Sequence, residues 1–243
     1  MATRTLNHPS SLRITQIPRL LARLVGRLWK GGVERHESVP RAMARPDPIP
    51  ASRSADVQPA PSGSGPLYYR AYTVDVLNPA LTARQMMARI QADPNAFAPD
   101  ELAVYRKTKG KRGRMQVGDE FFIELTGPWD APVRTIRVDD LSFTFATLED
   151  HMEAGEIRFQ IREHSGGWAF EIRSWARSRD AIVDFAYDKL KVAQWGQSEM
   201  WTLFSEAVAR ASGGQQKGDV VIRTERLPSE DLPEELEAPA SLL

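Results

Sequence analysis

The stretch from Phe143 to Trp175, FTFATLEDHMEAGEIRFQIREHSGGWAFEIRSW, decides the fold of this chain. Apolar and polar residues alternate through three successive runs separated by turn signals, which predicts a three-stranded antiparallel meander. The period of two predicts one apolar sheet face, made of Phe143, Phe145, Ile157, Phe159, Ile161, Trp168, Phe170 and Ile172. The charged residues of the other face are Glu156, Arg158, Arg162, Glu171 and Arg173. An aromatic face of this size has to be covered by another layer.

A long helix towards the C-terminus is the predicted cover. It begins at Asp180, which suits the N-cap position, and runs to about Ala211. Apolar residues recur there at helical spacing, at Ile182, Ala186, Leu190, Ala193, Met200, Phe204, Val208 and Ala211. At a rise of about 1.5 Å per residue this helix is roughly 45 Å long. A curved sheet wrapped around such a helix can enclose a ligand cavity.

The residues before the meander predict further strands and one short helix. Leu67 to Leu77 has the β-branched and aromatic content of a strand, and Asn78-Pro79 suits the start of a helix. The buried residues of that helix are Ala83, Met86, Met87 and Ile90. Arg114 to Thr126 and Val133 to Val138 are two more strands, and Val220 to Thr224 is a candidate for another. The predicted fold is therefore α+β, a curved antiparallel sheet of about six or seven strands around a long C-terminal helix.

Composition divides the chain into three parts. Residues 1–66 carry 10 Lys/Arg against 4 Asp/Glu, and consist of a basic helix and an extended linker rich in Pro and Ser. Residues 67–214 form the ordered domain, and residues 215–243 form an acidic tail with 3 Lys/Arg against 7 Asp/Glu. The net charge of the whole chain is zero, so this asymmetry predicts that the two tails meet different surfaces.

The segment from Leu12 to Trp29 predicts a basic amphipathic helix. Its apolar and cationic side chains lie on opposite faces, which suits a membrane surface or a groove in a partner protein. The residues expected at that contact are Leu20, Leu21, Arg23, Leu24, Arg27, Leu28 and Trp29. A helix folded back on its own domain is the alternative.

Composition also excludes several classes of protein. The chain has no cysteine, so disulfides, thiol catalysis and zinc–thiolate sites are ruled out. No uninterrupted apolar run approaches the roughly 20 residues that span a bilayer, so no transmembrane helix is expected. We expect a cytoplasmic protein that can lie peripherally at the inner membrane.

The motif F-x-F-x-T-L-x-x-H-x-E-x-G-E-x-x-F-x-I, from Phe143 to Ile161, and the FEIRSWARS run after it resemble an uncharacterised family, domain of unknown function nineteen-ninety. That family is grouped with the START-like, or Bet v 1-like, helix-grip folds. The resemblance covers Leu67 to Gly213 and neither tail. It implies the fold of a START-like domain but no activity. The chain departs from the family pattern at Ser142, where a Gly is usual, and at the sequence Trp175 to Asp180, where the family has Ser-Arg-Pro.

The hairpin sequence HMEAGE offers one candidate for chemistry. His151 and Glu156 flank it, with Glu153 between them, and are candidates for an acid/base pair or part of a metal site. A histidine bonded to a backbone carbonyl, with Gly155 supplying the turn, explains the same residues structurally and is the favoured interpretation. We therefore expect no catalytic residue, no metal site and no cofactor, and the sequence favours a protein that is not an enzyme without deciding the matter.

Six cations in nine residues make up a second candidate contact surface. They are Arg106, Lys107, Lys109, Lys111, Arg112 and Arg114, with Gly110 and Gly113 among them. Such a loop suits an acidic protein or an anionic lipid surface, and a solvated loop is the alternative. The neutral chain and the single nearby aromatic residue, Tyr105, argue against nucleic acid.

The aromatic sheet face and the apolar stripe of the last helix have two interpretations. They are a packed core by default, because large aromatic side chains can fill the space between the layers. Alternatively they line an apolar ligand cavity of the helix-grip type. The residues of that predicted cavity are Phe143, Phe145, Phe159, Ile161, Phe170, Met200 and Phe204.

Two hypotheses of function follow. The first is a non-catalytic accessory subunit that docks peripherally on a membrane-associated protein complex through its N-terminal helix and tails. The second is a carrier or binding module for an apolar small molecule such as a lipid, quinone, pigment or polyketide-like compound, or an enzyme acting on one. The sequence favours the first, because the basic helix, the linker and the acidic tail exceed what a soluble carrier needs.

Overall fold

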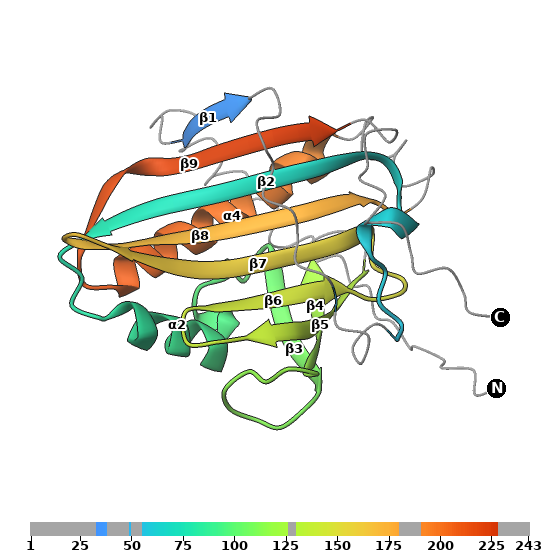
Figure 1. Cartoon of the computed structure of the whole chain (residues 1–243), viewed down its shortest axis with the longest axis horizontal. Coiled ribbons are helices and arrows are strands. Elements are labelled where there is room, and N and C mark those ends of the chain that lie inside the picture. The colour runs from blue at the N-terminus through green and yellow to red at the C-terminus, as the bar shows by residue number, and fades with distance from the viewer. Residues whose placement is uncertain (1–32, 38–48, 50–54, 126–129, 180–190, 228–243) are drawn as a thin grey trace.

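The computed structural model describes residues 33–37, 49, 55–125, 130–179 and 191–227, and these residues build one large sheet with helices on one side (Figure 1). The strands are β1 (Val33–Glu37), β2 (Ser64–Leu77), β3 (Ala103–Lys109), β4 (Glu120–Leu125), β5 (Asp130–Val138), β6 (Ser142–Thr147), β7 (Glu153–His164), β8 (Gly167–Ser178) and β9 (Gln215–Leu227). Their order is β1-β9-β2-β8-β7-β6-β5-β4-β3. All neighbours are antiparallel except β1, which runs parallel to β9.

The predicted meander is present as β6, β7 and β8. Phe159 on β7 lies opposite Phe143 on β6 and opposite Ile172 on β8, so the apolar residues of the three strands fall on one face. The charged residues lie on the other face, where Glu171 accepts a hydrogen bond from Gln160 at 2.6 Å and pairs with Arg173 at 2.8 Å. Period-two alternation therefore assigned both faces of the meander correctly.

The sheet is larger than the predicted six or seven strands. Ala103–Lys109 was expected to be part of a loop, yet it forms β3 and pairs with β4. Val220 to Thr224 was expected as a candidate strand within the segment assigned to the acidic tail. The strand is present and longer, because residues 215–227 form β9, which pairs with β2 from Leu67↔Leu227 to Leu77↔Gln215. Charged residues towards both ends of β9 obscured its full length in the sequence. The sheet-forming part of the chain thus continues past residue 214.

Two α-helices, α2 (Ala83–Ala92) and α4 (Lys191–Ala211), and two short 3-10 helices, η3 (Ala60–Ser62) and η4 (Pro94–Ala96), complete the described elements. The expected N-cap of α2 at Asn78 is wrong. Thr82 caps the helix instead, because its hydroxyl accepts from the Gln85 N–H while the Gln85 side chain accepts from the Thr82 N–H. The expected start of α4 at Asp180 lies outside the described residues.

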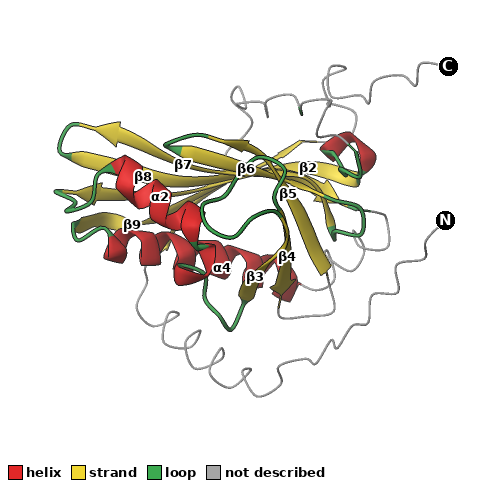
Figure 2. Cartoon of the chain, turned by 90° about the horizontal axis from the view of Figure 1, so that it is seen from below, coloured by secondary structure: helices red, strands yellow, loops and turns green. Residues whose placement is uncertain are grey.

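Both α-helices cover the same face of the sheet, here called the inner face (Figure 2). Met86, Met87 and Ile90 of α2 are fully buried, and so are Phe204 and Val208 of α4. They join the apolar residues of the sheet in one continuous core cluster. A small second cluster of Tyr69, Ala71 and Trp175 lies on the opposite, outer face. The α+β fold, with an antiparallel sheet and a C-terminal helix, is thus as predicted.

Gly155 is a position where the packing of two strands requires glycine. A Cβ atom there would lie 2.0 Å from the carbonyl oxygen of Trp175, which is backbone and cannot rotate away. We expect Gly155→Ala to lower the free energy of unfolding by about 3 kcal/mol, through backbone strain and overpacking together. Urea denaturation of the purified variant measures this.

Gly113→Ala is the matched control, because Gly113 also has a positive φ but no atom lies within 4 Å of the position its Cβ would take. The control is expected to lose only about 1 kcal/mol through backbone strain. Equal losses in the two variants would show that the contact with Trp175 is not what requires glycine.

Candidate functional site

The predicted cavity residues are brought together on the inner face, where they contact one another. The rings of Phe143 and Phe159 are stacked with centroids 4.6 Å apart. Phe159 also meets the two aromatic residues of α4, Trp201 at 5.5 Å and Phe204 at 5.6 Å. All seven predicted residues belong to the core cluster and are at most 6% exposed. The seven residues predicted from the sequence therefore do belong to one cluster in the structure.

Two buried hydroxyl groups beside the aromatic residues of this cluster have no hydrogen-bond partner among the described residues. One belongs to Tyr105 on β3 and the other to Thr135 on β5. Thr135 lies directly opposite Phe145 in the β5–β6 register, and the ring of Tyr105 lies 6.5 Å from the ring of Phe145. Both residues are therefore neighbours of the same phenylalanine. An unpaired buried polar group costs about 1–3 kcal/mol, so such groups are rare in native cores.

The Tyr105 ring is held firmly in place. The side chain of Asn95 donates to the Tyr105 carbonyl at 3.0 Å and accepts from the Tyr105 N–H at 2.7 Å. This pair of hydrogen bonds fixes the backbone from which the ring projects into the core. Burial raises the pKa of the Tyr105 hydroxyl well above its usual range, so it is a neutral donor at physiological pH.

A different kind of surface occupies the other end of the inner face. Tyr68 and Arg70 lie two residues apart on β2 and so share one face, and Arg226 on β9 lies opposite Tyr68. The Arg70 guanidinium carbon is 4.7 Å from the centre of the Tyr68 ring, and that of Arg226 is 6.0 Å away. Glu153 on β7 lies 3.9 Å from Arg70. We call these four residues the polar end of the inner face.

The hairpin histidine has a structural role, as favoured from the sequence, although its partner differs. His151 is buried, and its Nδ1 accepts a hydrogen bond from the Glu153 N–H at 2.8 Å rather than donating to a carbonyl. Gly155 lies within β7 and not in the turn. Glu156 lies opposite Trp175 on the outer face, so it does not form an acid/base pair with His151. Among the residues described, no group of metal-ligating side chains is assembled.

The six cations of the predicted contact loop are largely neutralised. Arg106 pairs with Glu124, Lys107 with Asp119 at 2.7 Å and Lys109 with Glu120 at 3.0 Å. Arg114 donates to Gln91 at 2.8 Å and lies 3.4 Å from a carboxylate oxygen of Asp140. Within the described part of the chain, only Lys111 and Arg112 of the six show no ion pair. The loop is therefore a weaker anion-binding surface than its sequence suggested.

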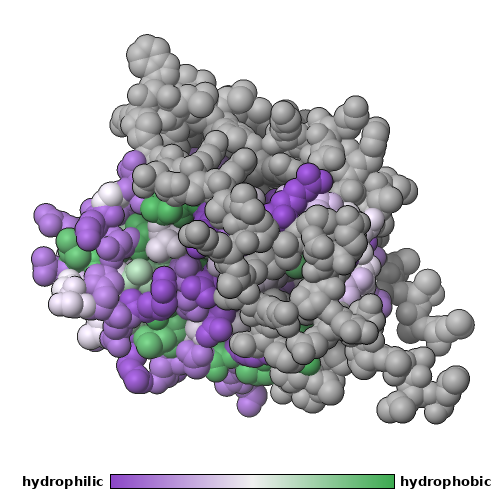
Figure 3. Space-filling view, turned by 45° about the horizontal axis from the view of Figure 1, so that its top comes forward, coloured by the Kyte–Doolittle hydropathy of each residue, from purple (hydrophilic) through white to green (hydrophobic). Residues whose placement is uncertain are grey.

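On the coloured part of the face shown in Figure 3, hydrophilic residues predominate and apolar residues gather in small separate groups. Val117, at 40% exposure, is the one large apolar side chain of the described residues that is exposed. The predicted contact residues of the N-terminal helix, Leu20 to Trp29, lie outside the described residues. None of the helices in the described ranges combines the length and the apolar character needed to cross a membrane.

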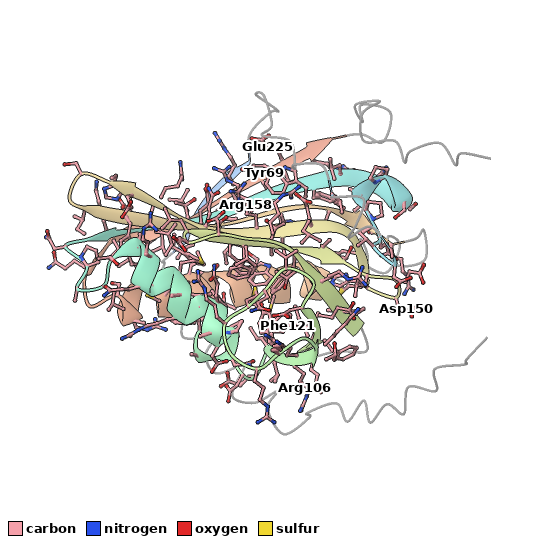
Figure 4. The ribbon with its side chains drawn as sticks, turned by 60° about the horizontal axis from the view of Figure 1, so that its bottom comes forward. Tyr69, Arg106, Phe121, Asp150, Arg158 and Glu225 are labelled. Atoms are coloured by element: carbon pink, nitrogen blue, oxygen red, sulfur yellow. The ribbon has the colours of Figure 1, made fainter. Side chains whose placement is uncertain are left out.

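The side chains in Figure 4 separate the two faces of the sheet. Phe121, which belongs to the core cluster, lies on the inner side, while Tyr69, Arg158 and Glu225 lie on the outer side. The candidate site is therefore interior: an aromatic cluster with two unpaired hydroxyls, bordered at one end by a tyrosine and two arginines. Among the described residues, this arrangement places no nucleophile beside a base.

These features define an α+β protein whose antiparallel sheet packs around a C-terminal helix. The chain belongs to the family described as Domain of unknown function (DUF1990), whose model matches residues 56–202. The match begins before the predicted boundary at Leu67, in a segment where Gln58 donates hydrogen bonds to the carbonyls of His151 and Glu153. The resemblance to this family inferred from the sequence is thereby confirmed.

Solved structures with a similar fold include three of different origin. The hypothetical protein jhp0584 from Helicobacter pylori is 9% identical, with a TM-score of 0.41, and the match covers 70% of this chain and 99% of that one. The di-domain ARO/CYC StfQ from the steffimycin biosynthetic pathway is 11% identical, with a TM-score of 0.40 and coverages of 60% and 52%. Ara h 8.0201 is 9% identical, with a TM-score of 0.37 and coverages of 60% and 97%. None of the curated proteins matches the chain.

Sequence reasoning missed the hydroxyls and the polar end. Tyr105 was counted only as a neighbour of the basic loop, although Ala103, Tyr105 and Lys107 alternate as in a strand. Arg70 lies in the strand LYYRAYTVDVL between Tyr68 and Tyr72, and the alternation puts all three on the inner face. The inward position of Arg70 could therefore have been predicted from the sequence. Arg226 lay in the segment assigned to the acidic tail, and only the β2–β9 register brings it to Tyr68.

His151 gives the fold a defined pH dependence. Burial lowers the pKa of His151 from its ordinary 6.5 to about 4. Below pH 6.5 the unfolded chain therefore binds a proton that the folded chain does not, so stability falls as the pH falls towards 4. We expect a loss of about 2 kcal/mol between about pH 7 and about pH 5 from this residue alone.

Urea denaturation at both pH values tests this expectation on the wild type and on His151→Gln. The variant should lose less stability than the wild type over the same interval, even if it is less stable at neutral pH. Parallel losses in both proteins would assign the acid sensitivity to other groups.

Tyr105→Phe removes a hydroxyl that bonds to no other group in the part of the chain that the structure describes. A hydroxyl that stabilised the fold would make this variant less stable than the wild type. Removal of an unpaired buried hydroxyl should instead raise stability, because the cost of burying it is removed as well. We expect the free energy of unfolding of the unliganded protein to rise by about 1 kcal/mol. Tyr72→Phe, at another buried tyrosine of the same cluster, is the control in the same urea experiment. A loss of stability in Tyr105→Phe would contradict the assignment.

Proposed function

We propose that this protein is a binding module that holds a small, largely apolar molecule between the inner face of the sheet and α4. The observation that carries the proposal is the pair of unpaired hydroxyls, Tyr105 and Thr135, beside Phe145 in the aromatic cluster. Phenylalanine and valine would fill the same space without the cost of burying an unpaired hydroxyl. A ligand that accepts hydrogen bonds from both groups would remove that cost.

The surroundings of the hydroxyls suit such a ligand. Rings of Phe143, Phe145 and Phe159 provide apolar contact area, and the aromatic residues of α4 close the other side. Binding sites for small molecules are typically apolar with a few well-placed polar groups, which is the composition found here. Because the rings touch one another, the ligand has to displace some of these contacts when it binds.

The accessory-subunit hypothesis from the sequence receives less support from the described residues. Its main element, the N-terminal helix, lies outside them, and most charges of its basic loop are already paired. The described surface also offers no large apolar patch for a protein partner. A carrier that attaches to a membrane or a complex through residues 1–32 would combine both hypotheses, and the binding module is the part supported by geometry.

Purification of the full chain from its source, without overexpression, tests the proposal directly. Small molecules released by heating and solvent extraction are identified by mass spectrometry, alongside any co-purifying proteins. We expect one apolar compound with at least one hydrogen-bond acceptor, close to one molecule per chain. Recovery of the protein in stoichiometric complex with membrane proteins and without a small molecule would instead support the accessory subunit.

A titration with a fluorescent probe gives a second test. Prodan is an apolar naphthalene with one carbonyl acceptor, and anthracene is a similar hydrocarbon with none. We expect Tyr105→Phe and Thr135→Val each to weaken prodan binding by about tenfold and to leave anthracene binding unchanged. Phe159→Trp, which overfills the cluster, should weaken both. Unchanged prodan affinity in all three variants would refute the interior site.

A further inference from the structure

The polar end of the inner face shows an unusual concentration of cationic groups for the interior side of a sheet. Arg70 continues the row of inward residues Tyr72, Val74 and Val76 along β2, so its charge lies on the same face as the core. Its side chain is 11% exposed, and the only described anion near it is Glu153 at 3.9 Å. At that distance the contact is an ion pair without a good hydrogen bond.

The guanidinium of Arg70 keeps its hydrogen-bonding capacity. The structure shows no hydrogen bond from it to any other described residue, although a guanidinium has five N–H donors. Arg226 likewise shows no ion pair among the described residues, and its only contact of this kind is with the Tyr68 ring. The polar end thus presents two cations against one carboxylate.

Tyr68 explains how two like charges are held near each other. Its ring lies 4.7 Å from the Arg70 guanidinium and 6.0 Å from that of Arg226, distances at which the ring face attracts cations. Such contacts also orient the planar guanidinium groups. A guanidinium group with unused N–H donors can bind a carboxylate through two parallel hydrogen bonds, and a second one nearby adds charge and further donors, so the pair suits an anionic carboxylate.

The polar end is continuous with the aromatic cluster. Arg70 lies opposite Ser174 on β8, and four residues along the same strand is Phe170, which stacks on Phe204 of α4. Four residues of a strand span about 13 Å, close to the length of a medium-chain amphiphile. The helix α4 packs against β2, β8 and β9, the three strands that carry this path. A ligand with a head and a tail could therefore lie along them.

We propose that the molecule held on the inner face is an amphipathic carboxylate, with its anionic head at Arg70 and Arg226 and its apolar body on the aromatic cluster. This inference rests on the proposed function and adds the chemical class of the ligand. The polar end supplies the charge recognition, and Tyr68 positions the two guanidinium groups. Glu153 offsets part of the charge of Arg70 when no ligand is bound.

Calorimetric titration of the full chain with dodecanoate, below its critical micelle concentration, and with dodecanol tests the inference. These probes have chains of equal length and differ in the charge of the head. We expect dodecanoate to bind about tenfold more tightly than dodecanol, because charge-assisted hydrogen bonds form only with the carboxylate. We expect Arg226→Gln to remove this difference while leaving dodecanol affinity unchanged.

Arg226 is the residue of choice because it is exposed and its replacement should not disturb the fold, which circular dichroism verifies. Arg112→Gln is the matched control, since it removes one exposed positive charge from the distant β3–β4 loop. It should change neither affinity. Arg226→Lys keeps the charge without the planar fork, and an intermediate affinity for dodecanoate is expected.

The outcomes separate this inference from the proposed function. If both probes bind equally in the wild type and Arg226→Gln changes nothing, the interior site stands and the anionic head is refuted. If neither probe binds, and prodan does not bind either, the proposed function itself fails. If inorganic phosphate competes with dodecanoate but not with dodecanol, and binds alone with similar affinity, the polar end is a site for free anions and the amphiphile is refuted.

Discussion

The contact between Phe159 and α4 is the interaction on which the rest of the structure depends. Phe159 lies in the middle of β7, stacks on Phe143 of the neighbouring strand and meets Trp201 and Phe204 of the helix. A single sheet with one aromatic face cannot be stable in water without a second layer, and this cluster joins the two layers. Every candidate group of the site is placed relative to it, with the unpaired hydroxyls near one side of the cluster and the polar end farther along the strands.

The sequence predicted those parts of the fold that are dictated by local periodicity. The meander from Phe143 to Trp175 was predicted with its two faces correct. In such strands, alternate residues face the core and the other side of the sheet, and the sequence alternates accordingly. The capping box at Thr82 was missed because Asn78-Pro79, a few residues earlier, is also a common helix start. Strand β9 was predicted only at its centre, Val220 to Thr224. Its full length was missed because charged residues alternate with apolar ones in a segment whose composition is dominated by the acidic residues that follow.

The candidate site shows a different limit. Its aromatic residues were predicted because they belong to the periodic strands and helix. The polar end was not, because it exists only where β9 returns from the helix and pairs with β2, bringing Arg226 beside Tyr68. Tyr68 and Arg226 are more than 150 positions apart in the sequence, and no local pattern specifies their contact. The cations of the basic loop were predicted as a contact surface, but several are paired with carboxylates on a neighbouring strand, and the sequence alone does not show that pairing.

Strand β9 also limits how far α4 can move relative to the sheet. The C-terminal end of α4 is tied down, because the carbonyl of Ser212 accepts hydrogen bonds from the N–H groups of Ala80 and Leu81, and the chain then pairs along almost the whole of β2. Swinging that end of the helix away would break the β2–β9 ladder, a cooperative set of backbone hydrogen bonds. The strand that brings Arg226 beside Tyr68 is therefore also the strand that holds the C-terminal end of α4 against the sheet.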